Sequence, residues 1–440
     1  MTTTKRSKGV SRRQFLVAGG ATAIVLPNLI TGCATTRPHP SEQITLGVIG
    51  CGGQGNSDTD SFLEHKNCRV IAACDVDRSH LDEMVQKVNK HYNNADCKGY
   101  ADYRELLARP EIDAVLIAVP DHWHGLIGTE AGRRKKDIYG EKPLARTIAE
   151  QQSIVQAVTG NDCVWQTGSW QRSQSHFHKA AEIVRNGLIG KVTRVEVGLP
   201  SGQGNFKEQE PFMMASDPPP ELDYDMWIGP SRKMLYVKAR VHGNWRWNYN
   251  TGGGQLLDWV GHHCDIAHWG LGFDNNGPYE VEGHGEFPPF DYVWNTSPKY
   301  RIELKYPQDI AMTMAGGYDD IKSGTKWIGT DGWVWVDRGG FEASNKDWQD
   351  MKQLPESERK VKLIISTDHT GNFLDSVKSR LPTIAPVRTA HHSAIPGHLG
   401  LISMLVGRKI KWDVQQELIL GDPEAWELLT RPFRAPFKLG

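Results

Sequence analysis

The stretch LGVIGCGGQGN at residues 46–56 constrains the fold of this 440-residue chain more than any other. An apolar segment typical of a buried strand runs directly into a GxGxxG motif, and a helix-like stretch follows. In such a unit the first glycine permits a tight turn, the second lets backbone approach a pyrophosphate, and the third lets the helix pack on the strand. The motif predicts a dinucleotide site at a helix N-terminus. Its residues are Gly50, Gly52, Gly53, Gln54 and Gly55.

Strands and helices alternate over residues 44–169, which predicts a Rossmann domain with a doubly wound parallel sheet of the α/β class. Asp75 ends the second apolar strand, where a carboxylate can accept hydrogen bonds from ribose hydroxyls. An acid at this position repels a 2′-phosphate, so the sequence favours NAD. Arg78 lies close by in the sequence and keeps NADP open as an alternative.

Longer strands separated by glycine and proline follow, at 191–199, 300–307, 309–317 and 325–337. This pattern favours a large, mostly antiparallel open sheet. We therefore expect an α+β domain over residues 170–440 that binds substrate and mediates oligomerisation. The helical stretches after Asn372 are expected to return and pack on this domain or on the first.

The first 33 residues carry five basic residues and an apolar run at 15–30 that is too short for a membrane span. Arg12 and Arg13 lie in SRRQFL, which resembles a twin-arginine export signal, and ITGC ending at Cys33 resembles a lipobox. We expect export to the periplasm and a lipid anchor at Cys33, followed by a polar tether over 34–43. A basic arm beside a stray apolar helix is the alternative.

Removal of that segment leaves an acidic body, because the whole chain has a formal net charge of -1 and the segment contains no acidic residue. An acidic body without a basic run argues against nucleic acid as a partner. The six other cysteines show no CxxC or metal-type spacing, and a twin-arginine substrate folds in the reducing cytoplasm, so free thiols are expected. They are Cys51, Cys68, Cys74, Cys97, Cys163 and Cys264.

The segment PDHWH begins at Pro120, at the carboxyl end of the strand at 113–120, where such sheets bind ligands. His122 and His124 could form a metal site, but the loop holds no companion ligands, so no metal is predicted. We instead expect Pro120 and His124 to contact the nicotinamide half of the cofactor.

Two further segments carry candidate catalytic groups. Lys142, in Glu141-Lys142-Pro143, follows a short strand, where a charged lysine can stabilise a developing alkoxide; a salt-bridged loop lysine is the alternative. Asp258 and His262 lie four residues apart in GGGQLLDWVGHHCD. On a helix they share a face, so the carboxylate can fix the imidazole while His262 takes a hydroxyl proton.

GxGxxG, then Glu-Lys-Pro, then GGG-x-x-x-Asp-x-x-x-His-x-x-Asp resembles the glucose-fructose oxidoreductase, inositol dehydrogenase and MocA family. The resemblance covers nearly all of the chain after the export segment, including QTGSWQRS at 166–173 and NFLDSVKSR. It implies that Lys142 is the catalytic lysine, Asp258 the substrate-orienting aspartate and His262 the proton acceptor, with Glu141 and Lys142 beside the cofactor. Many relatives have glycine two residues after the aspartate, where this chain has Val260.

The same resemblance places the sugar-binding side chains. The expected sugar contacts, besides His262, are Arg172, Trp245, Arg246 and Trp247. Relatives often form dimers or tetramers, so a homodimer or homotetramer is expected.

The implied reaction oxidises a secondary hydroxyl, at C3 by preference, of a sugar or glycoside and passes hydride to NAD or NADP. The cofactor should be tightly bound, because an exported enzyme meets no free nicotinamide pool. One alternative is redox-neutral glycoside cleavage through a transient 3-keto sugar. The glycosidases of this superfamily usually carry a tyrosine and a histidine in place of the Asp-x-x-x-His pair. A lipid-anchored carbohydrate-binding protein without activity is a second alternative.

Overall fold

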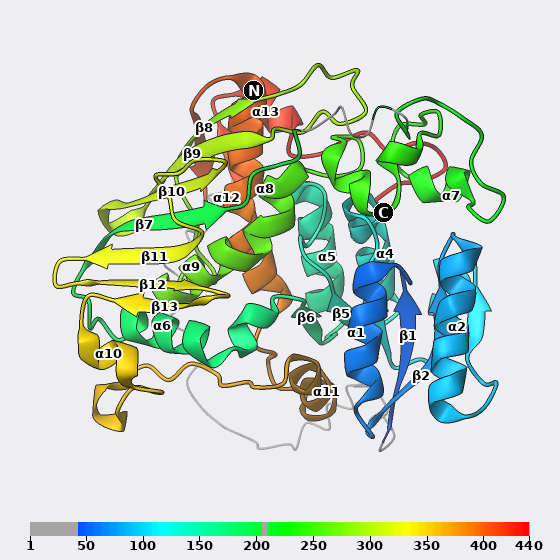
Figure 1. Ribbon diagram of the computed structural model, residues 1–440, viewed down its shortest axis with the longest axis horizontal. Coiled ribbons are helices and arrows are strands. Elements are labelled where there is room, and N and C mark those ends of the chain that lie inside the picture. Colours follow the sequence, from blue (N-terminus) through cyan, green and yellow to red (C-terminus); the bar gives the residue numbers. More distant parts are fainter. Residues whose placement is uncertain (1–42, 205–209, 211, 440) are drawn as a thin grey trace, which may run out of the picture. The chain divides into compact units, whose positions relative to one another are not determined.

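In the computed structural model, residues 43–204, 210 and 212–439 are described, so the predicted export signal, Cys33 and nearly all of the tether lie outside the described residues. The described residues carry two β-sheets, which lie on opposite sides of helix α12 (Val387–Val406) in Figure 1. Each sheet has its own helices, and the candidate site forms where the elements of the two sheets meet.

The first sheet is six-stranded and parallel throughout, with strand order β3-β2-β1-β4-β5-β6. Its strands are β1 (Ile44–Ile49), β2 (Cys68–Cys74), β3 (Lys98–Tyr100), β4 (Ala114–Ile117), β5 (Asp137–Gly140) and β6 (Trp165–Thr167). The chain order reverses at β1 and β4, so ligands are expected above the carboxyl ends of these strands. The predicted doubly wound parallel sheet is confirmed. Only β3 had no sequence signal, because it is short and mostly exposed.

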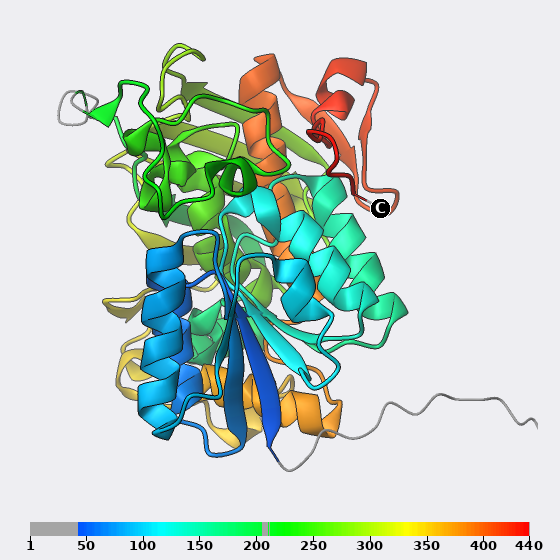
Figure 2. The same ribbon diagram turned by 90° about the vertical axis from the view of Figure 1, so that its right-hand side faces the viewer.

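Helices cover both faces of this sheet, as Figure 2 shows with α1 and α2 on one side and α4 and α5 on the other. Their bounds are α1 (Gly53–Leu63), α2 (Arg78–Tyr92), α3 (Tyr103–Leu107), α4 (Asp121–Arg133), α5 (Ile148–Gly160) and α11 (His369–Ser379). Phe62 of α1 packs against Phe373 of α11, with ring centroids 6.0 Å apart. The chain after Asn372 therefore returns to the first domain, which is one of the two positions expected for it.

The second sheet is nine-stranded, with order β13-β12-β11-β7-β10-β9-β8-β14-β15. All its strand pairs are antiparallel except β7 with β10, which confirms the mostly antiparallel sheet. Its strands are β7 (Val192–Leu199), β8 (Glu280–Glu286), β9 (Lys299–Tyr306), β10 (Ile310–Gly316), β11 (Gly324–Gly329), β12 (Trp333–Asp337), β13 (Gly340–Ala343), β14 (Ile410–Asp413) and β15 (Leu418–Leu420). The segment expected as one strand at 325–337 is a hairpin, because Thr330 to Gly332 turn between β11 and β12.

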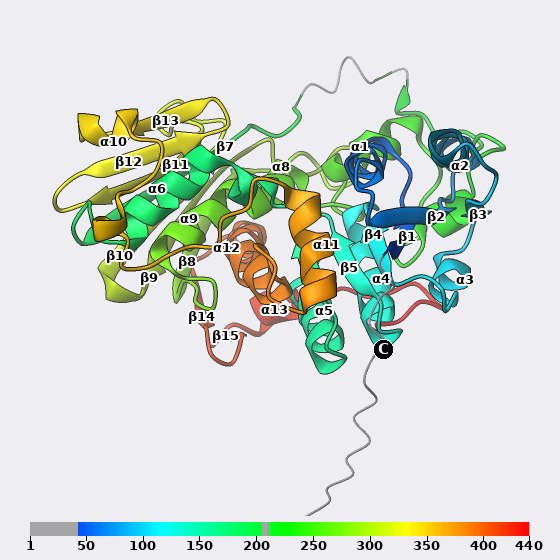
Figure 3. The same cartoon turned by 90° about the horizontal axis from the view of Figure 1, so that it is seen from below.

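One face of the second sheet is buried under helices. Strand β9 alternates buried and more accessible residues, as expected for a sheet with one covered face. The covering helices are α6 (Ser175–Arg185), α8 (Gly254–Trp259), α9 (Asp265–Leu271) and α12. Helix α12 is buried along almost its whole length and lies between α5 and β8, seen from below in Figure 3. Its buried histidines are bonded to α5, since His391 and His398 lie 2.8 and 2.6 Å from Gln151.

The chain between β7 and β8 brings parts of the second domain over the first. It includes α7 (Tyr224–Ile228) and two 3-10 turns, η3 (Lys238–Arg240) and η4 (His242–Trp247). Leu222 forms a β-bridge with Asp77, and Trp227 and Trp245 share a small apolar cluster. This segment therefore lies beside the carboxyl end of β2.

Two short helices, α10 (Lys346–Asp350) and α13 (Pro423–Glu427), lie elsewhere in the described part of the chain. The same part holds the 3-10 turns η1 (Trp170–Ser173), η6 (Pro307–Asp309) and η7 (Glu356–Glu358). The six cysteines of the described residues are free thiols, as expected. Within the same residues, no helix combines the length and apolar character needed to cross a membrane.

Candidate active site

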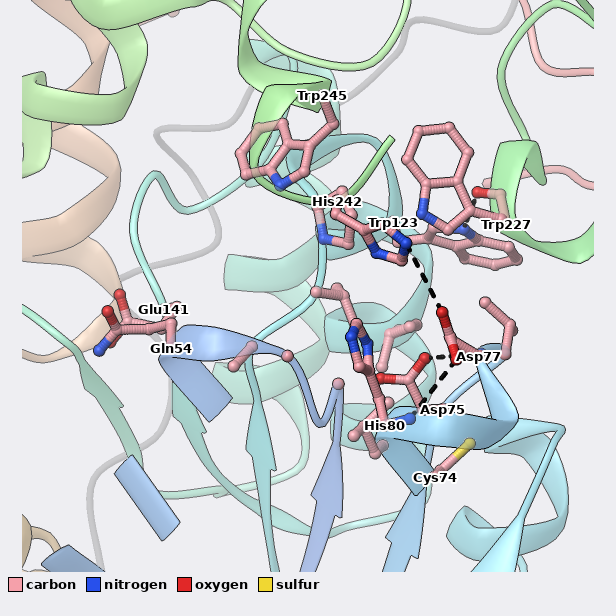
Figure 4. A pocket seen from close by; sticks show the side chains of 18 of the residues that line it. Gln54, Cys74, Asp75, Asp77, His80, Trp123, Glu141, Trp227, His242 and Trp245 are labelled. Carbon is pink, nitrogen blue, oxygen red and sulfur yellow. Dashed lines mark hydrogen bonds and ion pairs between the residues drawn. The ribbon is translucent and has the colours of Figure 1, made fainter. Parts of the chain in front are cut away.

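A cavity of about 370 Å³ opens above the carboxyl ends of β1, β2 and β4, at the predicted position. One wall is the glycine motif and the other is the segment between β7 and β8, which contributes Trp227, His242 and Trp245 (Figure 4). Of the sequence-predicted site residues, those lining the cavity are Gly50, Gly52, Gly53, Gln54, Asp75, Pro120, Glu141, Lys142, Trp245 and Arg246. Most of the predicted cofactor residues therefore share one cavity.

The glycines of the motif differ in what surrounds them. Gly50 has φ +93°, a conformation that side chains disfavour, and an added Cβ would lie 2.4 Å from Ala118 O. A Cβ on Gly55 would lie 1.9 Å from Gly50 O, so α1 packs directly on the turn. A Cβ on Gly52 or Gly53 would meet nothing within 4 Å. The open space therefore lies over Gly52, the N-cap of α1, which makes no side-chain capping bond.

The carboxylate of Asp75 lies beside the glycine motif, at the nucleotide end of this cavity. Its Oδ2 accepts a hydrogen bond from Cys51 N–H (2.7 Å) and its Oδ1 from Asp77 N–H (2.9 Å). Burial raises the pKa of Asp75, and the two backbone donors oppose that rise. The open helix N-terminus and this acid fit the pyrophosphate and a ribose of a dinucleotide.

Three further side chains of this end were not predicted from the sequence. Asp77, His80 and His242 come within 4.8 Å of one another, with Asp77 Oδ2 3.6 Å from His242 Nε2 (Figure 4). These residue types bind metals, although no metal was predicted from the sequence. No local spacing reveals the group, because His242 comes from η4 in the second domain.

The PDHWH segment is positioned differently from the expectation. Pro120 lines the cavity, but His124 is buried behind it, 2.7 Å from both Pro143 O and Val119 O. His124 joins the loop after β4 to the Glu-Lys-Pro loop. Because both its ring nitrogens face backbone carbonyls, the geometry does not support the expected contact with the nicotinamide half of the cofactor. His122 Nε2 lies 2.9 Å from Trp227 O and joins α4 to α7.

Lys142 and Asp258 meet at the inner end of the cavity. Lys142 Nζ lies 3.0 Å from Asp258 Oδ1, and Arg246 Nε donates to the same oxygen at 2.9 Å. Burial acts to raise the pKa of Asp258, but the charges of Lys142 and Arg246 outweigh it and lower the pKa. Asp258 is therefore ionised and lies between two cations. Lys142 is salt-bridged, as the alternative interpretation of this residue expected, and it also lines the cavity.

His262 lies beside Lys142 but is not held by Asp258, which corrects the helix-face prediction. The turn η5 (Val260–Cys264) is π-helical and follows α8 directly, so the regular four-residue spacing is lost between the two side chains. Asp258 is bonded to Lys142 and Arg246 instead, and the buried Nδ1 of His262 has no hydrogen-bond partner among the described residues. A Cβ on Gly261 would lie 2.9 Å from Lys142 Cβ, so the turn packs on the lysine.

The surroundings of His262 keep its imidazole neutral. Burial lowers the pKa of His262 well below its usual range, and the positive charges of Lys142 and Arg338 lower it further. A neutral, nearly buried imidazole in contact with a lysine-bearing loop can accept a proton.

The predicted sugar contacts divide into two groups. Trp245 and Arg246 line the cavity, with the guanidinium 4.4 Å from the indole centroid, whereas Trp247 is not part of the lining. The prediction that Arg172 contacts the sugar is corrected, because its guanidinium is buried in ion pairs with Asp265 (2.6 Å) and Asp274 (3.0 Å). A buried arginine committed to two carboxylates is fixed under the site and is not free for a sugar.

Buried carboxyl groups surround the lysine from the first domain. Asp58 accepts from Gln54 Nε2 at 2.9 Å, and Glu141 Oε1 has no partner among the described residues. Burial raises the pKa of both Asp58 and Glu141, and it raises the pKa of Asp121 to about 7. Asp58 and Asp121 were not predicted, because each lies on a helix whose sequence gives no sign of the neighbouring charges.

Comparison with protein families decides the assignment. A model described as "Oxidoreductase family, C-terminal alpha/beta domain" matches residues 174–439, and one described as "Oxidoreductase family, NAD-binding Rossmann fold" matches residues 44–169. The chain belongs to the glucose-fructose oxidoreductase, inositol dehydrogenase and MocA family. The cavity over the glycine motif is thus part of an NAD-binding domain.

Two curated relatives of the family show different chemistry. The myo-inositol 2-dehydrogenase of Thermotoga maritima is 30% identical over 146 residues, which are 33% of this chain and 42% of the relative. The alpha-N-acetylgalactosaminidase of Shewanella oneidensis is 27% identical over 214 residues, 42% of this chain and 45% of the relative. In both cases the match spans less than half of the relative's length.

Two solved structures share the fold. The aldose-aldose oxidoreductase of Caulobacter crescentus, complexed with glycerol, has a TM-score of 0.61 at 17% identity and covers 84% of this chain and 99% of its own. The WlbA dehydrogenase of Chromobacterium violaceum, in complex with NADH and UDP-GlcNAcA, has a TM-score of 0.62 at 16% identity and covers 85% and 97%. At this identity the likeness concerns the fold alone.

Proposed function

We propose that this family member oxidises a secondary hydroxyl, by preference C3, of a sugar or glycoside with NAD as hydride acceptor. The observation that carries the proposal is the meeting of Lys142, Asp258 and the turn bearing His262 at the inner end of the NAD cavity. Three sequence-distant segments converge there on one charged centre. Oxidation of an alcohol needs a proton acceptor and a group that stabilises the alkoxide.

Each of these residues has a role that its environment supports. His262, neutral because burial and neighbouring cations lower its pKa, accepts the hydroxyl proton. Lys142 donates a hydrogen bond to the developing alkoxide, and Asp258 fixes the lysine ammonium at 3.0 Å. The bound nicotinamide supplies the acceptor for the hydride. Arg246 and Trp245, side by side on the cavity wall, orient the sugar ring.

The cofactor is proposed to be tightly held NAD. Asp75 is partly buried and bonded to two backbone N–H groups at the ribose end, where its charge disfavours the 2′-phosphate of NADP. The η4 segment adds His242 and Trp245 over the cavity and limits exchange of the nucleotide. Tight retention suits an enzyme that works where no free nicotinamide is available.

Redox-neutral glycoside cleavage is the second candidate. It is favoured by the similarity to the Shewanella glycosidase, which covers 42% of this chain. In that reaction oxidation at C3 acidifies the C2 hydrogen, the aglycone is eliminated, water adds, and the hydride returns to the sugar. The same Lys142 and His262 would serve its first step, so only the products distinguish the two candidates.

The test uses the protein purified without added nucleotide. A panel of free sugars and aryl glycosides is added, and reduced-nicotinamide absorbance and aglycone release are followed together. A lasting stoichiometric absorbance with a keto-sugar and no aglycone supports the dehydrogenase. Aglycone released over many turnovers with little standing absorbance supports the glycosidase and contradicts our first proposal.

We further propose twin-arginine export to the periplasm, a lipid anchor at Cys33, and a homodimer or homotetramer. The proposal of export is supported by Arg12, Arg13 and the sequence before Cys33, which lie outside the described residues. Labelling of cells with a radioactive fatty acid, compared with a Cys33→Ala variant, tests the anchor. Sedimentation of the protein without its first 33 residues tests the oligomer.

A further inference from the structure

The turn between β12 and β13 reaches the candidate site from the second sheet. Asp337, which ends β12, accepts from Ser323 Oγ (2.8 Å) and lies 3.2 Å from His263 Nε2. His263 precedes Cys264 in the same π-helical turn that bears His262. The turn is thus tied to the backbone that positions the proposed base.

Arg338 follows Asp337 in this turn and is exposed. Its guanidinium carbon lies 4.4 Å from the ring centroid of Trp259 and 4.7 Å from that of Trp170. Two indoles therefore hold one cation in place through cation–π contacts. The Trp259 ring also lies 5.4 Å from the His262 ring, so one indole contacts both the guanidinium and the proposed base.

Both indoles are themselves fixed on the catalytic turn. Trp259 ends α8 immediately before η5, and its ring stacks on His263 with centroids 5.7 Å apart. Trp170 follows Ser169, whose Oγ donates to Gly261 O at 2.9 Å. The position of Arg338 is therefore built into the site and does not depend on a freely moving surface chain.

The acids near Arg338 are already engaged. Asp337 is held by Ser323, His263 and the Arg338 backbone N–H, and Asp258 by Lys142 and Arg246. Among residues 43–204, 210 and 212–439, no carboxylate lies within ion-pair distance of the Arg338 guanidinium, and no hydrogen bond from it is found. Five N–H donors beside the proposed base are thus available to a ligand.

The cations around the site also outnumber its ionised acids. Lys142, Arg246 and Arg338 lie around two bonded carboxylates, Asp258 and Asp337. The first-domain carboxyls Glu141 and Asp121 are only partly ionised near neutral pH, since burial raises the pKa of both. An anionic ligand would be attracted to this end of the site.

We propose that Arg338 binds an anionic substituent of the substrate, so that the preferred substrate is an acidic sugar or glycoside carrying a carboxylate, phosphate or sulfate. This inference rests on the proposed sugar oxidation, whose substrate class it narrows. A guanidinium matches the geometry of such oxyanions through paired N–H donors. Trp170 and Trp259 keep it oriented, and the bound anion would place a ring hydroxyl near His262.

The test measures ligand binding by calorimetry on the full NAD-loaded protein. The probes are glucuronate, galacturonate, glucose 6-phosphate and glucose 6-sulfate, each compared with its neutral sugar. At least one acidic sugar should bind about ten- to a hundredfold more tightly than its neutral counterpart, the range for a hydrogen bond to a charged group. The pattern over the probes distinguishes carboxylate, phosphate and sulfate.

Arg338→Met removes the charge and keeps an apolar side chain against the indoles. It should abolish the preference for the acidic sugar and leave neutral-sugar affinity unchanged. The matched control is Lys326→Met, because Lys326 is a cation over Trp333 (4.7 Å) in the same sheet and outside the site. This control should behave as the unsubstituted protein does.

Two results overturn the inference: no acidic sugar binds better than its neutral counterpart, or the preference survives in Arg338→Met. Nicotinamide reduction is followed in parallel with all probes. If acidic sugars bind through Arg338 and none reduces the nicotinamide, the anion site stands and the proposed oxidation fails. If neutral sugars are oxidised as well as acidic ones and bind as tightly, the oxidation stands and the inference fails.

Discussion

The two ends of the cavity are built in different ways. The nucleotide end is formed mainly by backbone and by residues close in sequence, since Gly50, Gly52 and Asp75 belong to two neighbouring strand–turn–helix units; His242 is added from the second domain. The sugar end gathers Lys142, Asp258 and His262 from separate segments and places them by ion pairs and a π-helical turn. Backbone shape is sufficient to hold a common cofactor, whereas substrate chemistry needs charged groups whose positions depend on the whole fold.

The largest effect is expected from His262→Ala. Loss of a positioned general base should lower hydride transfer by about 10²- to 10⁴-fold, while nucleotide binding stays unchanged because His262 is not part of the cavity lining. Stopped-flow nicotinamide reduction and fluorescence titration of NAD measure the two effects. His284→Ala, an exposed histidine of β8, is the matched control. Unchanged turnover in His262→Ala would remove this residue from the mechanism.

Arg172→Met tests the support under the sugar end. Removal of one partner leaves Asp265 as an uncompensated buried charge, so the free energy of unfolding should fall by about 3–5 kcal/mol. Urea titration followed by tryptophan fluorescence measures it. Arg408→Met, in an exposed pair with Asp422 and Glu424, should cost far less, because solvent screens an exposed ion pair. Equal stability losses would show that the Arg172 pair is not a buried structural element.

Two glycines separate the roles within the nucleotide end. Gly55→Ala should lower the free energy of unfolding by about 1–3 kcal/mol, because its Cβ would lie 1.9 Å from Gly50 O. Gly52→Ala should leave stability unchanged and weaken NAD binding by about tenfold, because its Cβ points into the open cavity. Thermal unfolding and NAD titration of both variants measure this. Destabilisation by Gly52→Ala would contradict the assignment of open space.

The smallest effect concerns pH. The pKa of His262 is lowered by burial and by the nearby charges of Lys142, Arg338 and His263. Activity that needs the neutral imidazole should therefore persist below the usual histidine pKa of about 6.5. Removing one positive charge in Arg338→Met raises that pKa, so the acid limb of kcat/KM should move to higher pH. The pH profile is measured on a neutral sugar, whose affinity does not involve Arg338. An acid limb that moves to lower pH would contradict the charge assignment.

The sequence by itself determined the two-domain α/β and α+β fold, the NAD cavity, and the glycine motif and Asp75 at its nucleotide end. These features depend on local patterns: apolar strands of the right length, glycines in a fixed order, and Asp75 at the end of a strand. It also identified Lys142, Asp258 and His262 as neighbours. It did not place Arg172 or His124, because their buried partners, such as Asp265 and Pro143 O, are distant in sequence or belong to backbone.

Only the tertiary structure decided which side chains pair with one another at the sugar end. A π-helical turn separates His262 from Asp258, and the carboxylate pairs with Lys142 and Arg246 instead. Arg338 gives no sequence signal, since it lies in an ordinary hairpin turn far along the chain from Trp170 and Trp259. Charged side chains find their partners across domains after the backbone has folded, because their interactions depend on distance and burial and not on separation along the sequence.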